Sequence, residues 1–218
     1  MGVAGGCIVS AVPLHLVPHP VAQDALVSLR DSTTHYHLFR RLAHRVGIIL
    51  AAEATRDLDT HPVSVDTPLE TTTGQQLATD IVVVAVLRAG LSLVDSVLEL
   101  VPHARVGHVG LRRDETTAQA HKYSSHLPPA LDQSLVLLVD PMLATGGSAV
   151  MAIDILKQAG ARRIRLLSIV AAPEGVAALA AAHPDVDVYT PTLDRQLNDR
   201  KYILPGLGDF GDRLYGTE

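Results

Sequence analysis

Tryptophan is absent from this chain of 218 residues, and cysteine and long apolar runs are scarce. The single cysteine, Cys7, excludes an intramolecular disulfide and any metal site built from several thiolates, and it suits a reducing compartment. The longest uninterrupted apolar runs, such as residues 81–87, fall far short of the ~20 residues that cross a bilayer as a helix. The N-terminus carries no cationic segment ahead of its apolar residues. We therefore expect a cytoplasmic protein with no membrane partner.

Aromatic residues are also few. They make up 3% of the chain, whereas hydrophobic residues of all kinds make up 47%. The core must then be built from Leu, Val, Ile and Ala, which is typical of parallel strands covered by helices. A chain of this length buries a substantial core, and we expect one domain spanning residues 1–218.

The chain carries no excess of positive charge. Its formal net charge is −5, and its Lys and Arg residues form no cluster that recurs with aromatic side chains. Proteins that bind nucleic acid carry such basic patches, so nucleic acid is not expected as a partner. Eleven histidines are present, but no carboxylate or cysteine spacing around His35, His37 and His44 indicates a closed metal site. We interpret them as solvated histidines or as histidines on the surface of a helix.

The dominant positive feature is a repeated pattern of strand and helix. A helix is predicted over residues 34–57, and three units follow in which an apolar strand, a short turn and an amphipathic helix alternate. The units are strand 81–87 with helix 91–100, strand 135–139 with helix 148–159, and strand 164–170 with helix 174–183, and shorter strands are predicted at 106–110 and 186–189. The alternation predicts an α/β fold, a Rossmann-like and mostly parallel sheet flanked by helices, with right-handed crossovers.

Two segments interrupt this pattern. Residues 59–80 are rich in Thr, Pro, Asp and Gly without sustained periodicity, so we expect irregular structure there. Residues 112–129 mix charged, His and Pro residues, which indicates a projecting arm or a flexible loop. The domain then divides into an N-terminal helical segment at about 20–58, a core at about 80–190 and a C-terminal segment at about 191–218.

The segment VDPMLATGGS, residues 139–148, joins the second predicted strand to its helix. A small-residue turn at a helix N-terminus directs backbone N–H groups into one concavity, where the helix dipole also favours negative charge. Asp140 adds a carboxylate, which suits ribose hydroxyl groups or a divalent metal, so the expected ligand is a sugar phosphate. Thr-Gly-Gly-Ser alone also occurs as ordinary turn and cap chemistry. The acid, Pro141 and the three-residue spacer favour the functional interpretation.

This segment resembles the 5-phosphoribosyl 1-diphosphate (PRPP) loop of type I phosphoribosyltransferases. The uracil phosphoribosyltransferase branch has a single acid where other members have two adjacent ones, as Val139 and Asp140 do here. The resemblance extends over residues 34–217 approximately and implies the type I phosphoribosyltransferase fold, with a projecting arm and a C-terminal hood that binds the base. It also implies PRPP contacts along the whole loop, at Asp140, Pro141, Met142, Leu143, Ala144, Thr145, Gly146, Gly147 and Ser148.

Two arginines match the family's motifs. Arg88, in LRAG, follows the strand at 81–87, so its guanidinium is expected at the sheet's carboxyl edge, where two donors can grip a diphosphate. Arg113, in GLRRDETT, matches the arginine of the family's flexible-loop motif, which also contacts PRPP. Arg112 stands where members typically have an aromatic residue, so only Arg113 is carried over.

The C-terminal stretch LNDRKYILPGLGDFGDRLYGT, residues 197–217, resembles the uracil-recognition segment of the family. By that match the backbone of Ile203 and the turn at Gly208, Asp209 and Phe210 flank the base. The Asp209 carboxylate is also implied to lie beside the diphosphoribosyl group.

The resemblance implies an enzyme that joins uracil N1 to C1 of PRPP, with catalytic roles for Asp140, Asp209 and Arg113. It implies Mg²⁺ held mainly through the PRPP diphosphate, a homodimer or homotetramer, and GTP as an effector in some members. Two alternatives stay open. One is a phosphoribosyltransferase for another base, such as orotate or a purine, where orotate would require a cation such as Arg200 or Lys201 facing its carboxylate. The other is a regulatory protein that binds nucleic acid on the same fold.

Overall fold

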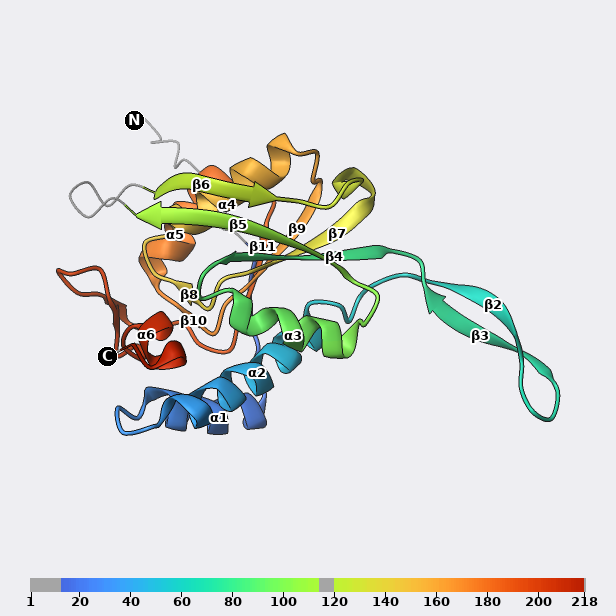
Figure 1. The fold of residues 1–218 in the computed structure, drawn as a ribbon, viewed down its shortest axis with the longest axis horizontal. Coiled ribbons are helices and arrows are strands. Elements are labelled where there is room, and N and C mark those ends of the chain that lie inside the picture. The colour runs from blue at the N-terminus through green and yellow to red at the C-terminus, as the bar shows by residue number, and fades with distance from the viewer. Residues whose placement is uncertain (1–12, 114–119, 218) are drawn as a thin grey trace, which may run out of the picture.

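A seven-stranded sheet forms the centre of the molecule (Figure 1). The computed structural model describes residues 13–113 and 120–217. It describes the side chains of all of these residues except 112, 113 and 120–122. The strand order is β1 (Leu14–Leu16), β11 (Asp187–Thr190), β9 (Arg163–Leu167), β7 (Ser134–Val139), β4 (Asp80–Leu87), β5 (Arg105–Arg113) and β6 (Ala120–His126). All neighbours pair in parallel except β5 and β6. The predicted mostly parallel α/β fold is confirmed.

The two central strands, β4 and β7, are buried on both faces because helices cover each side of the sheet. Along β4, Val83 and Ala85 belong to one apolar cluster, whereas Val82 and Val84 belong to the other. Side chains of a strand alternate between faces, so a continuous apolar run serves both clusters at once.

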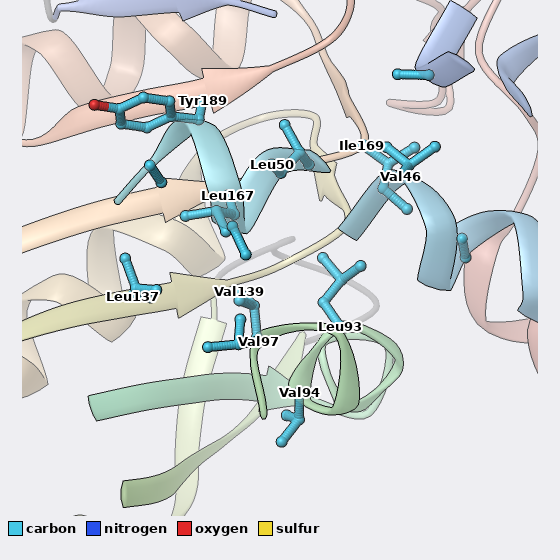
Figure 2. Close-up of a cluster of buried hydrophobic side chains, with 14 of the residues drawn as sticks. Val46, Leu50, Leu93, Val94, Val97, Leu137, Val139, Leu167, Ile169 and Tyr189 are labelled. Atoms are coloured by element: carbon cyan, nitrogen blue, oxygen red, sulfur yellow. The ribbon is translucent and has the colours of Figure 1, made fainter. Parts of the chain in front are cut away.

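One face is covered by α1 (Pro20–Arg30), α2 (Tyr36–Glu53) and α3 (Leu91–Leu100), and the other by α4 (Gly147–Gln158) and α5 (Pro173–Ala182). Figure 2 shows Leu93 of α3 between Val46 of α2 and Val139 of β7, all within one apolar cluster. The predicted helices at 34–57, 91–100, 148–159 and 174–183 are confirmed with small shifts at their ends. No helix within the described ranges combines the length and hydropathy needed to cross a membrane.

His44 has a defined place in the packing of α2 on α3. Its Nε2 lies 2.8 Å from a Glu99 oxygen, and its Nδ1 lies 3.0 Å from the hydroxyl of the fully buried Ser96. His44 of α2 thus links to α3 by these two hydrogen bonds. In the part of the chain that the structure describes, no group of three or more His, Cys, Asp or Glu residues is arranged to hold a metal ion.

The prediction of irregular structure at 59–80 is wrong for most of that segment. Strands β2 (Thr60–Asp66) and β3 (Thr71–Leu77) pair in antiparallel register as a hairpin that projects from the body (Figure 1). Most of its side chains are exposed on both faces, so the sequence carries no alternation of apolar and polar residues. Its Thr and Val residues favour extended backbone without that signal.

The prediction of an arm or loop at 112–129 is partly wrong, and residues 114–119 lie outside the description. Strand β6 extends the sheet by pairing with β5, with an irregularity in register between Gly110 and Leu111. The sequence of β6, AHKYSSH, is polar, as expected of an edge strand whose outer side is not paired, and such a strand has little apolar periodicity.

Candidate active site

The carboxyl ends of β4 and β7 meet at one edge of the sheet. The two strands pair in parallel up to Ala85 and Val139, so Arg88 and Asp140 follow them directly at the same edge. The backbone packs closely there: a Cβ added at Gly90 would lie 2.3 Å from the Val139 carbonyl oxygen. A glycine at this position lets the turn after β4 approach the turn after β7.

A cavity of about 320 Å³ opens at this edge, and it brings together most of the residues that sequence analysis selected. Nine of them line it: Arg88, Asp140, Met142, Ala144, Ser148, Ile203, Gly208, Asp209 and Phe210. These residues come from three separate parts of the chain. The sheet edge, the loop before α4 and the C-terminal segment therefore share one cavity.

The loop before α4 has the geometry of an anion site. Helix α4 begins at Gly147, and its N-cap Gly146 has φ = +82°, which favours glycine. The first-turn N–H groups of a helix have no acceptor within it, so those of α4 are directed to the side where the loop lies. A hollow of about 40 Å³ adjoins the loop and is lined by Asp140, Leu143, Thr145, Gly146 and Ser148, among others.

The loop is anchored by backbone pairing with the segment that follows β9. Strand β8 (Met142–Leu143) pairs in parallel with β10 (Val170–Ala171), which follows a break in the strand predicted at 164–170. The Pro141 carbonyl accepts hydrogen bonds from the N–H groups of Ile169 and Val170, at 3.0 and 3.1 Å. Pro141 and Gly147 line neither hollow, so the structure gives them places in anchoring the loop and starting the helix.

Asp140 is half-buried and oriented by its surroundings. Its backbone N–H donates to the Leu167 carbonyl at 3.2 Å, and its carbonyl accepts from the Ser168 hydroxyl at 2.6 Å. Its carboxylate Oδ1 lies 3.5 Å from the Met142 N–H. These contacts hold the carboxylate at the cavity wall beside the loop.

The C-terminal segment forms the opposite wall. Strands β12 (Gln196–Leu197) and β13 (Ile203–Leu204) pair in antiparallel register, and α6 (Phe210–Tyr215) follows. Asp209 is exposed, and its carboxylate caps α6 by accepting the Asp212 N–H at 3.0 Å. The ring of Phe210 contacts Phe39 edge to face, with centroids 5.1 Å apart, so this ring also anchors the segment to α2.

Comparison with known proteins decides the family. Residues 16–217 match the family model described as uracil phosphoribosyltransferase. The chain belongs to the uracil phosphoribosyltransferase family. A uracil phosphoribosyltransferase of Listeria innocua is 49% identical over 206 residues, 94% of this chain and 99% of the relative. One of Streptococcus agalactiae is 50% identical over 204 residues, 93% and 98% of the two chains.

Solved structures share the fold of this chain. The AQ2163 protein from Aquifex aeolicus superposes with a TM-score of 0.90 at 34% identity, covering 94% of this chain and 99% of that one. A hypoxanthine-guanine phosphoribosyltransferase from Bacillus anthracis reaches a TM-score of 0.51 at 13% identity over 73% of this chain and 80% of that one. At that identity the likeness concerns the fold, which is that of type I phosphoribosyltransferases.

In this member of the uracil phosphoribosyltransferase family, the cavity is also lined by residues that sequence analysis either missed or considered only for another base. Tyr202 lines the cavity, as do Arg200 and Lys201. Tyr215 donates its hydroxyl to the Arg88 carbonyl at 3.2 Å, and the Arg88 guanidinium carbon lies 5.9 Å from the Tyr215 ring centroid. The backbone of Arg113 belongs to β5, but its side chain is outside the description, so its predicted contact with PRPP stays a prediction.

Charges of both signs line the cavity. Arg88, Arg200 and Lys201 supply cations, and Asp140 and Asp209 supply carboxylates. Cations suit a diphosphate, and carboxylates suit ribose hydroxyl groups and a cationic ribose ring. The wall therefore has the chemistry that a charged sugar diphosphate requires.

Proposed function

We propose that this chain transfers the 5-phosphoribosyl group of PRPP to N1 of uracil and releases diphosphate and uridine monophosphate. One observation carries the proposal: the anion-binding loop with Asp140 and the C-terminal segment with Ile203 and Gly208 line the same cavity. The membership of the chain in the uracil phosphoribosyltransferase family supports it directly.

At one end of the cavity, the loop before α4 is placed to bind the 5-phosphate. The N–H groups at the start of the helix, the hydroxyls of Thr145 and Ser148, and the helix dipole all favour a phosphate there. We assign Asp140 to the ribose hydroxyls, which donate to a carboxylate. Arg88 grips the diphosphate, since a guanidinium presents two donors to one phosphate group.

At the other end, the C-terminal segment is placed to recognise the base. Uracil presents two carbonyl acceptors on either side of its N3–H donor, and backbone N–H and C=O groups around Ile203 and Gly208 can complement that pattern. Cytosine reverses part of the pattern and leaves buried groups unpaired, at a cost of about 1–3 kcal/mol per group.

Transfer requires stabilisation of two opposite charges. The ribose ring becomes cationic while the diphosphate leaves as an anion, so no covalent nucleophile is needed. Asp140 and Asp209 stabilise the ring, and Arg88 and Arg113 stabilise the leaving group. The N1–C1 bond forms as the C1–O bond to diphosphate breaks, and the N1–H proton passes to water or to the departing diphosphate without a dedicated general base.

The carboxylates also fit Mg²⁺ carried by PRPP. Asp140 and Asp209 line one cavity, and oxygen donors bound through water suit this ion. When bound, Mg²⁺ supplies neutralisation of the diphosphate charge. We propose that the ion would be held mainly through the PRPP diphosphate, with Asp140 and Asp209 as the protein residues that would help to hold it.

Assembly and regulation belong to the same proposal. We propose a homodimer or homotetramer, and we place it in the cytoplasm. The argument for an oligomer is that the β2–β3 hairpin projects from the body, and an isolated hairpin is only marginally stable in water. Packing against a second copy would cover it. Sedimentation velocity measures the oligomeric state.

Regulation by GTP is proposed from the family resemblance alone, and addition of GTP to the activity assay tests it.

The deciding experiment measures diphosphate release from PRPP and Mg²⁺ with uracil, cytosine, orotate and hypoxanthine in parallel. Uracil is expected to be the preferred base by a wide margin. Orotate is the second candidate, because Arg200 and Lys201 line the cavity and offer cations to a carboxylate. Release with orotate alone, or with none of the four bases, would overturn the proposed function.

A further inference from the structure

An ion pair behind the C-terminal wall holds the turn at Gly206. The Asp194 carboxylate accepts two hydrogen bonds from Arg30, from Nη2 to Oδ1 at 2.7 Å and from Nη1 to Oδ2 at 2.8 Å. Asp194 Oδ2 also accepts the Gly206 N–H at 2.8 Å, and Arg30 Nη1 donates to the Gly206 carbonyl at 2.9 Å. Both backbone polar groups of Gly206 are therefore engaged by this one pair.

Gly206 sits at the tightest point of the segment. Its φ is +59°, and an added Cβ would lie 2.1 Å from the Ile203 carbonyl oxygen. The turn thus folds directly onto Ile203, and Gly208 follows two residues later. Ile203 and Gly208 are the residues of this segment that we assign to the base, so a shift of Gly206 moves both ends of the base-binding wall.

The pair lies outside the cavity itself. Neither Arg30 nor Asp194 is among the described residues that line it, and the Asp194 side chain is only 3% exposed. Burial alone would raise the pKa of Asp194, but hydrogen bonds from Arg30 and Gly206 and the charge of Arg30 outweigh it and lower the pKa. The carboxylate is therefore ionised at neutral pH and keeps accepting hydrogen bonds from Arg30, from Gly206 and from the Thr192 hydroxyl, which lies 3.2 Å from Oδ1.

We propose that Arg30 and Asp194 are positioning residues for the base, which set uracil affinity by fixing the Gly206 turn without touching uracil. The role rests on the proposed function, because it concerns how that cavity binds its base. The loop before α4 is anchored on β10, and Asp194 also reaches β10, through its backbone N–H, which donates to the Ala171 carbonyl at 2.8 Å. A change confined to the Asp194 side chain leaves these backbone bonds in place, so the PRPP end is expected to respond much less than the base end.

The test is steady-state kinetics of Asp194→Asn, with uracil varied at saturating PRPP and then PRPP varied at saturating uracil. An amide at this site places a donor against a donor in either orientation, because its NH₂ faces Arg30 Nη2 in one and both Arg30 Nη1 and the Gly206 N–H in the other. Displacement of a binding wall by about 1 Å is enough to produce effects of one to two orders of magnitude, so we expect KM for uracil to rise on the order of tenfold. KM for PRPP should stay within about twofold.

Asp57→Asn is the matched control. Asp57 forms the same two-pronged pair with Arg165, at 2.6 and 2.7 Å, away from the cavity. It should leave both KM values unchanged. Arg30→Lys is the second variant of the proposed pair, since it keeps the charge but loses the planar fork, and it should raise KM for uracil by a smaller factor. It decides the question if Asp194→Asn fails to give a cooperative thermal unfolding transition.

The outcomes separate the two proposals. Loss of uracil affinity in Asp194→Asn or Arg30→Lys with PRPP affinity kept supports the positioning role. Equal rises in both KM values, or an unchanged KM for uracil, overturn it and leave the proposed function standing. Absence of uridine monophosphate synthesis by the unaltered chain overturns the proposed function and the positioning role together.

Discussion

The two walls of the cavity are built in different ways. The loop wall, residues 140–148, is held by backbone hydrogen bonds: Ile169 and Ala172 donate their N–H groups to the carbonyls of Pro141 and Leu143, at 3.0 and 2.9 Å. Such bonds join backbone groups, so they can persist when the side chains at these positions are changed.

The base wall, residues 203–210, combines the backbone pairing of β13 with β12 and hydrogen bonds from side chains. Arg30 holds Gly206 as described, and Arg213 donates to the Leu207 carbonyl at 2.7 Å while its guanidinium carbon lies 4.5 Å from the Phe39 ring centroid. Glu174 accepts the Leu197 N–H at 2.9 Å. Substitution of single side chains should therefore disturb base binding more readily than phosphate binding.

The largest expected effect comes from the carboxylates that face the reacting centre. Asp140→Asn and Asp209→Asn should each lower kcat by orders of magnitude, because an amide cannot neutralise a cationic ribose ring. Asparagine is as good an N-cap as aspartate, so α6 should persist in Asp209→Asn and the loss is chemical. Turnover measurements with circular dichroism of both variants check this.

The control for these variants is Asp24→Asn, at an exposed position of α1. It removes one carboxylate of the same chemistry and should leave kcat unchanged. Wild-type turnover in Asp140→Asn or Asp209→Asn would refute the assigned roles.

The same contrast explains what could be predicted from sequence. The loop wall was predictable because its signals are contiguous: an apolar strand, the acid Asp140, small residues and an amphipathic helix follow one another. The base wall was found through a matching motif, but its supports were not, because Arg30 and Asp194 are 164 positions apart and neither carries a local signal. Pairing across such a separation is a property of the fold.

Sequence patterns do not reveal strands whose two faces are both exposed to solvent. The core strands at 81–87 and 135–139 were recognisable as apolar runs, since both faces are buried. The hairpin at 60–77 is exposed on both faces and therefore leaves no hydrophobic pattern to detect.

A moderate effect is expected from a change whose added atom contacts the loop wall directly. Gly175, near the start of α5, packs on the loop: an added Cβ would lie 2.5 Å from the Ala144 carbonyl oxygen and 2.8 Å from that of Leu143. Because both neighbours are backbone, Gly175→Ala must separate α5 from the loop, at a cost of about 1–3 kcal/mol in the free energy of unfolding. KM for PRPP should rise, whereas KM for uracil should not.

Urea unfolding and the two KM values measure this outcome. Gly74→Ala, in β3, is the control, because its added Cβ meets nothing closer than 3.5 Å. A Gly175→Ala variant that loses uracil affinity instead would show that the two walls are mechanically coupled, against the contrast drawn between them.

The smallest effect is a pH dependence of the support behind the base wall. The pKa of Asp194 is lowered in the folded state, mainly because the hydrogen bonds from Arg30 and Gly206 outweigh its burial. A lowered folded pKa means that the unfolded state binds the proton more readily, so the contribution to stability is present above the ordinary pKa of about 4 and is lost as pH falls through the folded value. The stability difference between the unaltered chain and Asp194→Asn should thus stay constant from pH 7 to about pH 4 and shrink only below it. Urea unfolding of both chains across this range measures it. A difference that already fades between about pH 7 and pH 5 would mean that burial dominates and that the buried carboxylate is protonated near neutrality, which would remove the ionic part of the support.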